Sequence, residues 1–95
     1  MHTMEKRIHQ RIESVLPEVI NLRHELHTHP ETRFEETWTS EYLCGILDSW
    51  EIPYRRGLAK GTGIVAVIEG KAGKTVALRT DIDGLEITEA TNLPY

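Results

Sequence analysis

Two aspartates that follow a short apolar run are the residues of this sequence best placed to do chemistry. Residues 76–78 form the apolar stretch expected of a covered strand, and Asp81 and Asp83 come shortly after it. Alternate side chains of an extended chain share a face, so both carboxylates are expected to point the same way. Carboxylates held close together repel each other unless a cation or N–H donors lie between them, which indicates a metal-site or acid/base role. The alternative is a pair of solvated acids, because Asp83-Gly84 is also a common turn pair.

Three histidines within six residues offer a second candidate metal site. His24 and His27 would lie one turn apart on a helix face, whereas His29 belongs to the chain that leaves the helix. Glu31 and Glu35 follow, but nothing in this spacing makes three or four ligands converge, as zinc requires. The structural alternative is favoured, because histidines at a helix C-terminus complement its negative end and can bond its free carbonyls.

The composition is that of an ordinary globular domain. The chain has 95 residues, of which 39% are hydrophobic and 27% charged, with a formal net charge of −4. This argues against a disordered or membrane-spanning chain. The sequence has no long run of Lys and Arg, and Arg55-Arg56 is too short to form a basic patch, so no nucleic-acid partner is expected.

The N-terminal residues and the single cysteine indicate a cytoplasmic protein. Residues 1–11 alternate charged and polar side chains and lack the apolar stretch of a secretory signal. Cys44 cannot form an internal disulfide, and it lies among apolar residues of an expected helix. We interpret it as a buried thiol in a reducing compartment. A nucleophilic cysteine is the alternative, although no histidine lies near it in sequence.

Two amphipathic helices are expected in the first half of the chain. The first covers about residues 4–27, where Pro17 should kink or split it and His29-Pro30 should end the helical region. The second covers about residues 35–49 and includes Gly45, for which a close packing contact is the expected reason. The apolar stripe of the first helix consists of Ile8, Ile12, Val15, Leu16, Val19, Ile20 and Leu26. The inner face of the second is expected to hold Trp38, Tyr42, Leu43, Ile46, Leu47 and Trp50.

Three strands are expected in the second half, at about residues 54–56, 63–69 and 75–81. The four residues 70–73 join the last two strands and are short enough for a hairpin, which makes that pair antiparallel. The loop 61–63 is expected to be a turn, because no helix follows to supply amides for a phosphate. The fold class is therefore α/β, with residues 1–95 forming one domain in which two helices cover a small sheet.

Five segments, in order and spacing, resemble one enzyme family. They are LRHELHTHPE (22–31), FEET (34–37), GTGIVA (61–66), ALRTDID (77–83) and EATNLPY (89–95). The chain is similar to the start of the metal-dependent amidohydrolases of the zinc metallopeptidase type. These include hippurate hydrolase, N-acyl-amino-acid amidohydrolases and auxin-conjugate hydrolases. Gly84 stands in place of a usual alanine, and Glu86 in place of a usual proline.

The resemblance implies the N-terminal part of a metallopeptidase-like α/β catalytic domain in a longer enzyme. Members hydrolyse the amide bond of N-acyl amino acids with two divalent metals (Zn, Mn, Ni or Co) and a glutamate as general base. The resemblance makes Asp83 the aspartate behind a metal ligand and Asp81 its neighbour at the rim of the site, neither of them a ligand. It places the metal ligands in a His-Ala-Cys-Gly-His segment beyond Tyr95, so this chain alone is expected to hold no metal and to be inactive.

A second hypothesis is a non-catalytic α/β module that associates with another polypeptide or with itself. A sheet edge and an apolar helix face without partners would both favour such contacts. The weakest alternative is a small metalloprotein built on His24, His27 and an acid. The family resemblance makes the first hypothesis, the N-terminal part of an amidohydrolase, the leading one.

Overall fold

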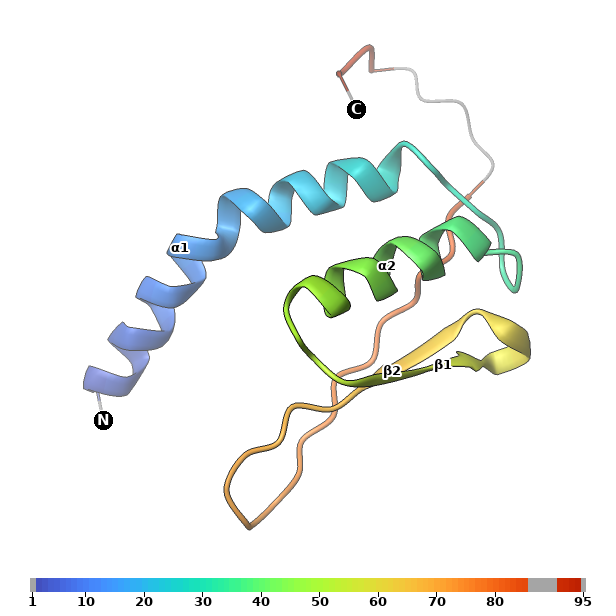
Figure 1. The fold of residues 1–95 in the computed structure, drawn as a ribbon. Coiled ribbons are helices and arrows are strands. Elements are labelled where there is room, and N and C mark those ends of the chain that lie inside the picture. The colour runs from blue at the N-terminus through green and yellow to red at the C-terminus, as the bar shows by residue number, and fades with distance from the viewer. Residues whose placement is uncertain (1, 86–90, 95) are drawn as a thin grey trace. The chain divides into compact units, whose positions relative to one another are not determined.

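The computed structural model describes residues 2–85 and 91–94, and it divides the chain into two compact units. The first unit consists of Met1–Thr28 with Thr91–Tyr95, and the second of His29–Ala90. Figure 1 shows the helices and strands of both units. Glu86 and part of the segment 89–95, which contributed to the family resemblance, lie outside the described residues.

The first unit contains one long helix, α1 (His2–His27), which confirms the expected helix. Pro17 lies inside it, and α1 continues through this residue as one element with a bend along its length (Figure 1). At its C-terminal end the Thr28 amide donates to the carbonyls of His24 and Glu25, both at 3.2 Å, and the Thr28 hydroxyl donates to Glu25 at 2.7 Å. Thr28 therefore satisfies carbonyls that any helix leaves open at this end.

The apolar stripe of α1 is exposed. Its exposed side chains are Ile8, Ile12, Val15, Leu16, Val19 and Ile20.

The second unit begins with a loop and the helix α2 (Thr37–Ser49). Helix α2 begins two residues later than expected, because Glu36 takes the non-helical N-cap conformation. The fully buried residues of α2 are Thr39, Ser40 and Cys44, none of which belongs to the predicted inner face. The residues predicted for that face are only half-buried: Trp38, Tyr42, Leu43, Ile46 and Leu47. The exception is Trp50, which is the C-cap residue and is 44% exposed.

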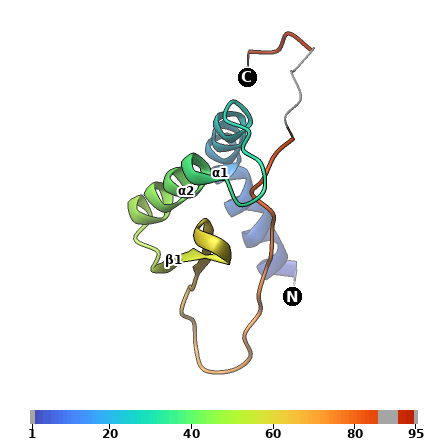
Figure 2. The same cartoon turned by 90° about the vertical axis from the view of Figure 1, so that its right-hand side faces the viewer.

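A two-stranded antiparallel sheet packs under α2 (Figure 2). Strand β1 (Tyr54–Leu58) pairs with β2 (Gly63–Ala66), with Tyr54 opposite Ala66 and Leu58 opposite Gly63. The register shifts between Arg55 and Leu58, which marks a bulge at this point of β1. The short 3₁₀ turn η1 (Ala59–Gly61) closes the hairpin with three consecutive residues at positive φ, so the expected turn before β2 is confirmed.

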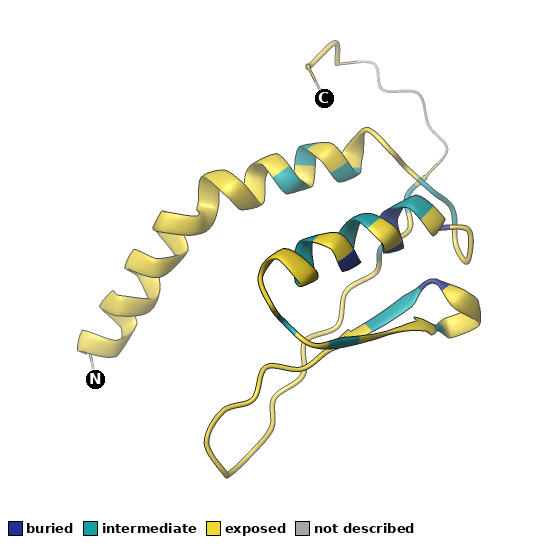
Figure 3. Cartoon of the chain, viewed as in Figure 1, coloured by how far each residue is buried: buried dark blue, intermediate teal, exposed yellow. Residues whose placement is uncertain are grey.

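The core of the second unit is small and lies between α2 and the hairpin (Figure 3). Among the described residues, Cys44 is the one apolar side chain that is fully buried, at 2% exposed. This confirms the interpretation of Cys44 as a buried thiol. The expectation for Gly45 is wrong, because a Cβ at this position would meet no atom within 4 Å.

The predicted third strand does not form in this structure, and neither does the predicted hairpin of the last two strands. The hairpin is instead β1 with β2, and residues 67–85 contain no strand. A buried strand is stabilised by a paired neighbour and a covered face, and this apolar run has neither, since Val76 and Leu78 are 87% and 98% exposed. The α/β class holds, as a fragment with two helices and a two-stranded hairpin.

Candidate functional site

Asp81 and Asp83 lie in an extended, mostly exposed segment of the second unit. Exposure alternates along it: both aspartates are exposed, whereas Ile82 and Gly84 are half-buried. The Asp81 carboxylate accepts a hydrogen bond from Arg79 Nη2 at 3.0 Å, and both side chains of this pair face solvent. Asp81 is therefore engaged with a cation from its own segment.

The described residues do not form a metal centre. No group of three or more His, Cys, Asp or Glu side chains among residues 2–85 and 91–94 could hold a metal ion. His24 and His27 belong to α1 in the first unit, whereas His29 lies in the second. Among the described residues, His24 and His27 are not joined by a third side chain that could complete a metal site. The same residues do not provide the ligands for the two metals that the resemblance implies.

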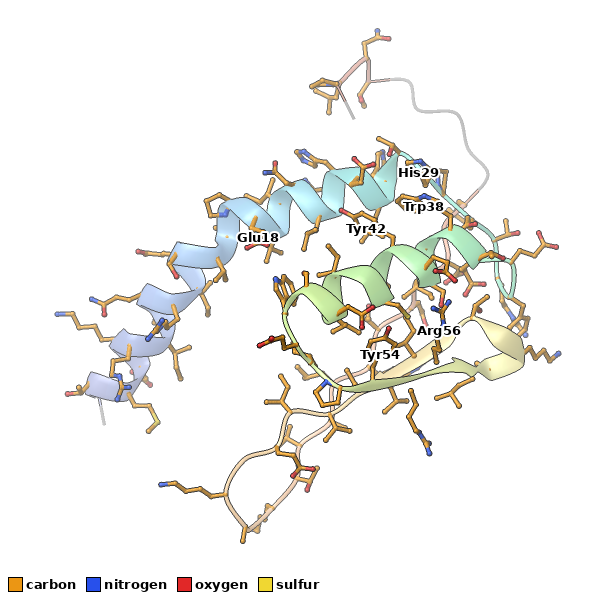
Figure 4. The ribbon with its side chains drawn as sticks, viewed as in Figure 1. Glu18, His29, Trp38, Tyr42, Tyr54 and Arg56 are labelled. Atoms are coloured by element: carbon orange, nitrogen blue, oxygen red, sulfur yellow. The ribbon has the colours of Figure 1, made fainter. Side chains whose placement is uncertain are left out.

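His29 takes part in an aromatic stack and not in a cluster of ligands. Its ring lies on that of Trp38, with centroids 3.7 Å apart and an angle of 12° between the planes. Trp38 in turn stacks on Tyr42 at 4.8 Å, one turn further along α2 (Figure 4). The stack ties the chain that enters the second unit to the outer side of α2.

Glu31 holds the first turn of α2 with its carboxylate. One oxygen accepts the Trp38 amide at 3.0 Å, and the other accepts the Thr39 amide at 2.6 Å and the Thr39 hydroxyl at 2.7 Å. These amides are among the donors that a helix leaves without partners at its N-terminus. Burial raises the pKa of the Glu31 carboxyl, but the bonds from Thr39 and Trp38 and the influence of His29 outweigh it, and the pKa lies below its usual value.

The main-chain carbonyl of Glu31 binds the segment that carries Asp81 and Asp83, called the acidic segment below. The Gly84 amide, next to Asp83, donates to the Glu31 carbonyl at 2.6 Å. A Cβ at position 84 would lie 3.2 Å from Pro30 Cβ and 3.4 Å from Pro30 Cα, so the two chains run in close contact. No local pattern of residues indicates this pairing, because it joins residues more than fifty positions apart.

A buried carboxyl group lies at the other side of the α2 N-terminus. Glu36 is 7% exposed, and its Oε2 accepts a hydrogen bond from the Thr62 hydroxyl at 3.4 Å. Its Oε1 and the Ser40 hydroxyl are buried and find no hydrogen-bond partner among the described atoms. Glu36 therefore ties α2 to the turn before β2, the segment that carries the GTG part of the sequence pattern.

The hairpin side of the core carries a second polar group. Arg56 Nη2 contacts Glu41 Oε1 at 2.5 Å, an exposed ion pair between β1 and α2.

Tyr54 and Cys44 lie close together between the hairpin and α2. Burial and a hydrogen bond with Asp48 raise the pKa of Tyr54 to about 12, with a smaller effect from the nearby Cys44. A thiol enclosed in this way is a poor nucleophile toward a dissolved substrate.

Three curated proteins show what this chain is similar to. YhaA of Bacillus subtilis, named as an amidohydrolase, is 34% identical over 94 residues, which is 98% of this chain and 24% of YhaA. The N-acetyldiaminopimelate deacetylase of Halalkalibacterium halodurans is 42% identical over 80 residues, 83% of this chain and 22% of the deacetylase. A hydrolase of Staphylococcus saprophyticus is 41% identical over 73 residues, 77% of this chain and 18% of that protein.

These matches place the chain in the amidohydrolase family, and they correspond to its N-terminal part. The chain spans about a quarter or less of the length of these relatives. No family model matches the chain, and no solved structure matches it significantly. Among the described residues, no helix is long and apolar enough to cross a membrane.

Proposed function

We propose that this chain is the N-terminal portion of a metal-dependent amidohydrolase that cleaves the amide bond of N-acyl amino acids. The observation that carries the proposal is the 42% identity to a deacetylase whose name gives N-acetyldiaminopimelate as its substrate. That compound is an amide between an acetyl group and an amino acid, the class of bond expected from the family resemblance. Three of the five motifs that carry the resemblance, FEET, GTGIVA and ALRTDID, lie wholly within the second unit.

The proposal assigns no metal to this chain alone. Two divalent ions would supply a water of lowered pKa and a polarised carbonyl in a complete enzyme. The described residues bring no three ligand side chains together, so they do not fit such a pair of ions. In this proposal Asp83 and Asp81 support a site whose ligands come from elsewhere, and the isolated chain does not turn over substrate.

Metal analysis and a hydrolysis assay test the proposal together. The purified chain is dialysed against Zn²⁺ or Mn²⁺, its metal content is measured, and it is then assayed on N-acetyl and N-benzoyl amino acids. We expect less than stoichiometric metal and no turnover above the buffer control. Stoichiometric metal with turnover would show that the chain is an enzyme by itself and would overturn the proposal.

One observation favours a second candidate function, in which the chain is a module that associates with another polypeptide. Residues 76–78 are apolar and extended, and Val76 and Leu78 are almost fully exposed. Such a segment lacks both a neighbouring strand and a cover. The partner that the comparisons favour is the part of an amidohydrolase that this chain does not match, because the matched part is at most 24% of the three relatives.

Light scattering after size-exclusion chromatography tests this candidate. The chain is run alone and with the unmatched part of YhaA expressed separately. Co-elution, weakened by Leu78→Asp but not by the control Lys71→Asp in the nearby loop, is the expected result. A chain that elutes as a monomer and does not bind the added polypeptide would contradict this candidate function. For either function we propose a cytoplasmic location, which the lone, buried Cys44 supports.

A further inference from the structure

Glu31 is bound at both its side chain and its main chain, and the two ends of the residue hold different parts of the second unit. The carboxylate takes three donors from Trp38 and Thr39 at the start of α2, between 2.6 and 3.0 Å. The carbonyl takes the Gly84 amide at 2.6 Å. Glu31 thus links the first turn of a helix to the residue that follows Asp83.

Contacts on both sides restrict the position of the loop that carries Glu31. The loop around Glu31 is fixed on one side by the stack of His29 on Trp38. On the other side Gly84 lies against Pro30, where even a methyl group would meet Pro30 Cβ at 3.2 Å. By contrast, residues 67–80 of the same chain are exposed and form no strand, so the contact at Gly84 is the point where the acidic segment returns to the packed part of the unit.

We propose that Glu31 is the positioning residue for Asp83: its carboxylate fixes the loop on α2, and its carbonyl then fixes Gly84 and the aspartate beside it. This inference rests on the proposed function, in which Asp83 supports a metal site. Glu31 does not touch that site and acts only through the placement of the acidic segment.

The chemistry of the contact explains why a carboxylate is needed at position 31. Three donors converge on two oxygens, and an ionised carboxylate offers acceptors only. A glutamine would turn an NH₂ group toward one side of this set and leave a donor facing donors. The Glu31→Gln variant keeps the size of the side chain and weakens its hydrogen bonding to the first turn of α2.

Hydrogen exchange of the Gly84 amide, measured by NMR on the whole chain, tests the proposal. Glu31→Gln is expected to speed Gly84 exchange at least about tenfold while the β1 and β2 amides keep their rates. The matched control is Glu35→Gln, the same chemical change in the same loop, where the carboxylate accepts the Thr32 hydroxyl at 3.2 Å. This control should leave Gly84 unchanged.

Two further measurements keep the test decisive if Glu31→Gln fails to fold. Thr39→Ser retains the hydroxyl and should preserve Gly84 protection, whereas Thr39→Val removes it and should reduce the protection. In the unaltered chain, a scalar coupling across the hydrogen bond between Gly84 ¹⁵N and Glu31 ¹³C′ should be visible. Unchanged Gly84 exchange in a folded Glu31→Gln variant, or no such coupling, would overturn the inference. These readouts need neither metal nor turnover, so they fail or succeed independently of the proposed amidohydrolase activity.

Discussion

The Glu31 carboxylate accepts both the amide and the hydroxyl of Thr39, at 2.6 and 2.7 Å, across a separation of eight residues. The N-cap residue of α2 is Glu36, whose side chain makes no capping bond. The helix is therefore capped from outside, by a side chain of the preceding loop. This arrangement makes the stability of the second unit depend on one ionised group.

Acid should weaken the second unit through Glu31. Its pKa in the folded state lies below the usual value of 4.5, so the stabilisation is present above that value and is lost as the pH falls through the lower, folded-state pKa. Urea unfolding followed by circular dichroism between pH 7 and pH 3 measures this loss. Glu31→Gln should cost about 1 kcal/mol at pH 7, as the loss of a helix cap does, and should flatten the acid limb. An unchanged acid limb in the variant would contradict the assignment.

Gly45→Ala should stabilise the chain. Gly45 lies inside α2, is exposed, and has no atom within 4 Å of the position that a Cβ would take. Alanine is favoured over glycine in a helix interior by about 1 kcal/mol, and the urea midpoint should rise accordingly. Gly57→Ala is the control with the opposite expected sign. Gly57 has a φ of 75°, a conformation that disfavours any side chain, so this substitution should lower the urea midpoint. A lower midpoint for Gly45→Ala would mean that a neighbour covers this position.

Tyr54 should ionise late and mark the packing of α2 on the hairpin. Burial and the Asp48 contact raise its pKa to about 12, above the ordinary 10.0. Because the folded pKa is the higher one, the associated stability is present below pH 10 and is lost as the pH rises toward 12. Ultraviolet absorption at high pH should lose its latest tyrosinate step in Tyr54→Phe. If Tyr54→Phe instead removes a tyrosinate step near the ordinary pKa of 10.0, the Tyr54 hydroxyl is not buried.

The exposed ion pair between Arg56 and Glu41 should matter little. Their side chains are 45% and 65% exposed, and solvent and salt screen such pairs. Glu41→Gln should change the free energy of unfolding by less than about 1 kcal/mol, with the difference shrinking further in high salt. A larger, salt-independent loss in urea unfolding would show that the pair is part of the core.

Local sequence signals predicted the helices and the family but not the contacts that join distant parts. The period of apolar residues gave α1 and most of α2, because a helix bonds only within itself. The run around Val76 and Leu78 looked equally like a strand, but a strand needs a neighbour, and within residues 67–85 none forms. The Glu31–Gly84 bond joins two loops and has no periodic signature. The sequence pattern therefore indicated Asp81 and Asp83 as candidates, but it did not indicate the Glu31–Gly84 hydrogen bond beside them.

A chimera with the Halalkalibacterium halodurans deacetylase tests whether this chain can serve as the N-terminal part of an amidohydrolase. Its 80 matched residues are replaced by the corresponding segment of this chain, and hydrolysis of N-acetyldiaminopimelate is assayed. We expect an active chimera, with activity strongly reduced by Asp83→Asn and retained in the matched loop control Glu35→Gln. A folded chimera that hydrolyses nothing, or one whose activity is indifferent to Asp83→Asn, would contradict the claim that this chain provides the N-terminal part of an amidohydrolase.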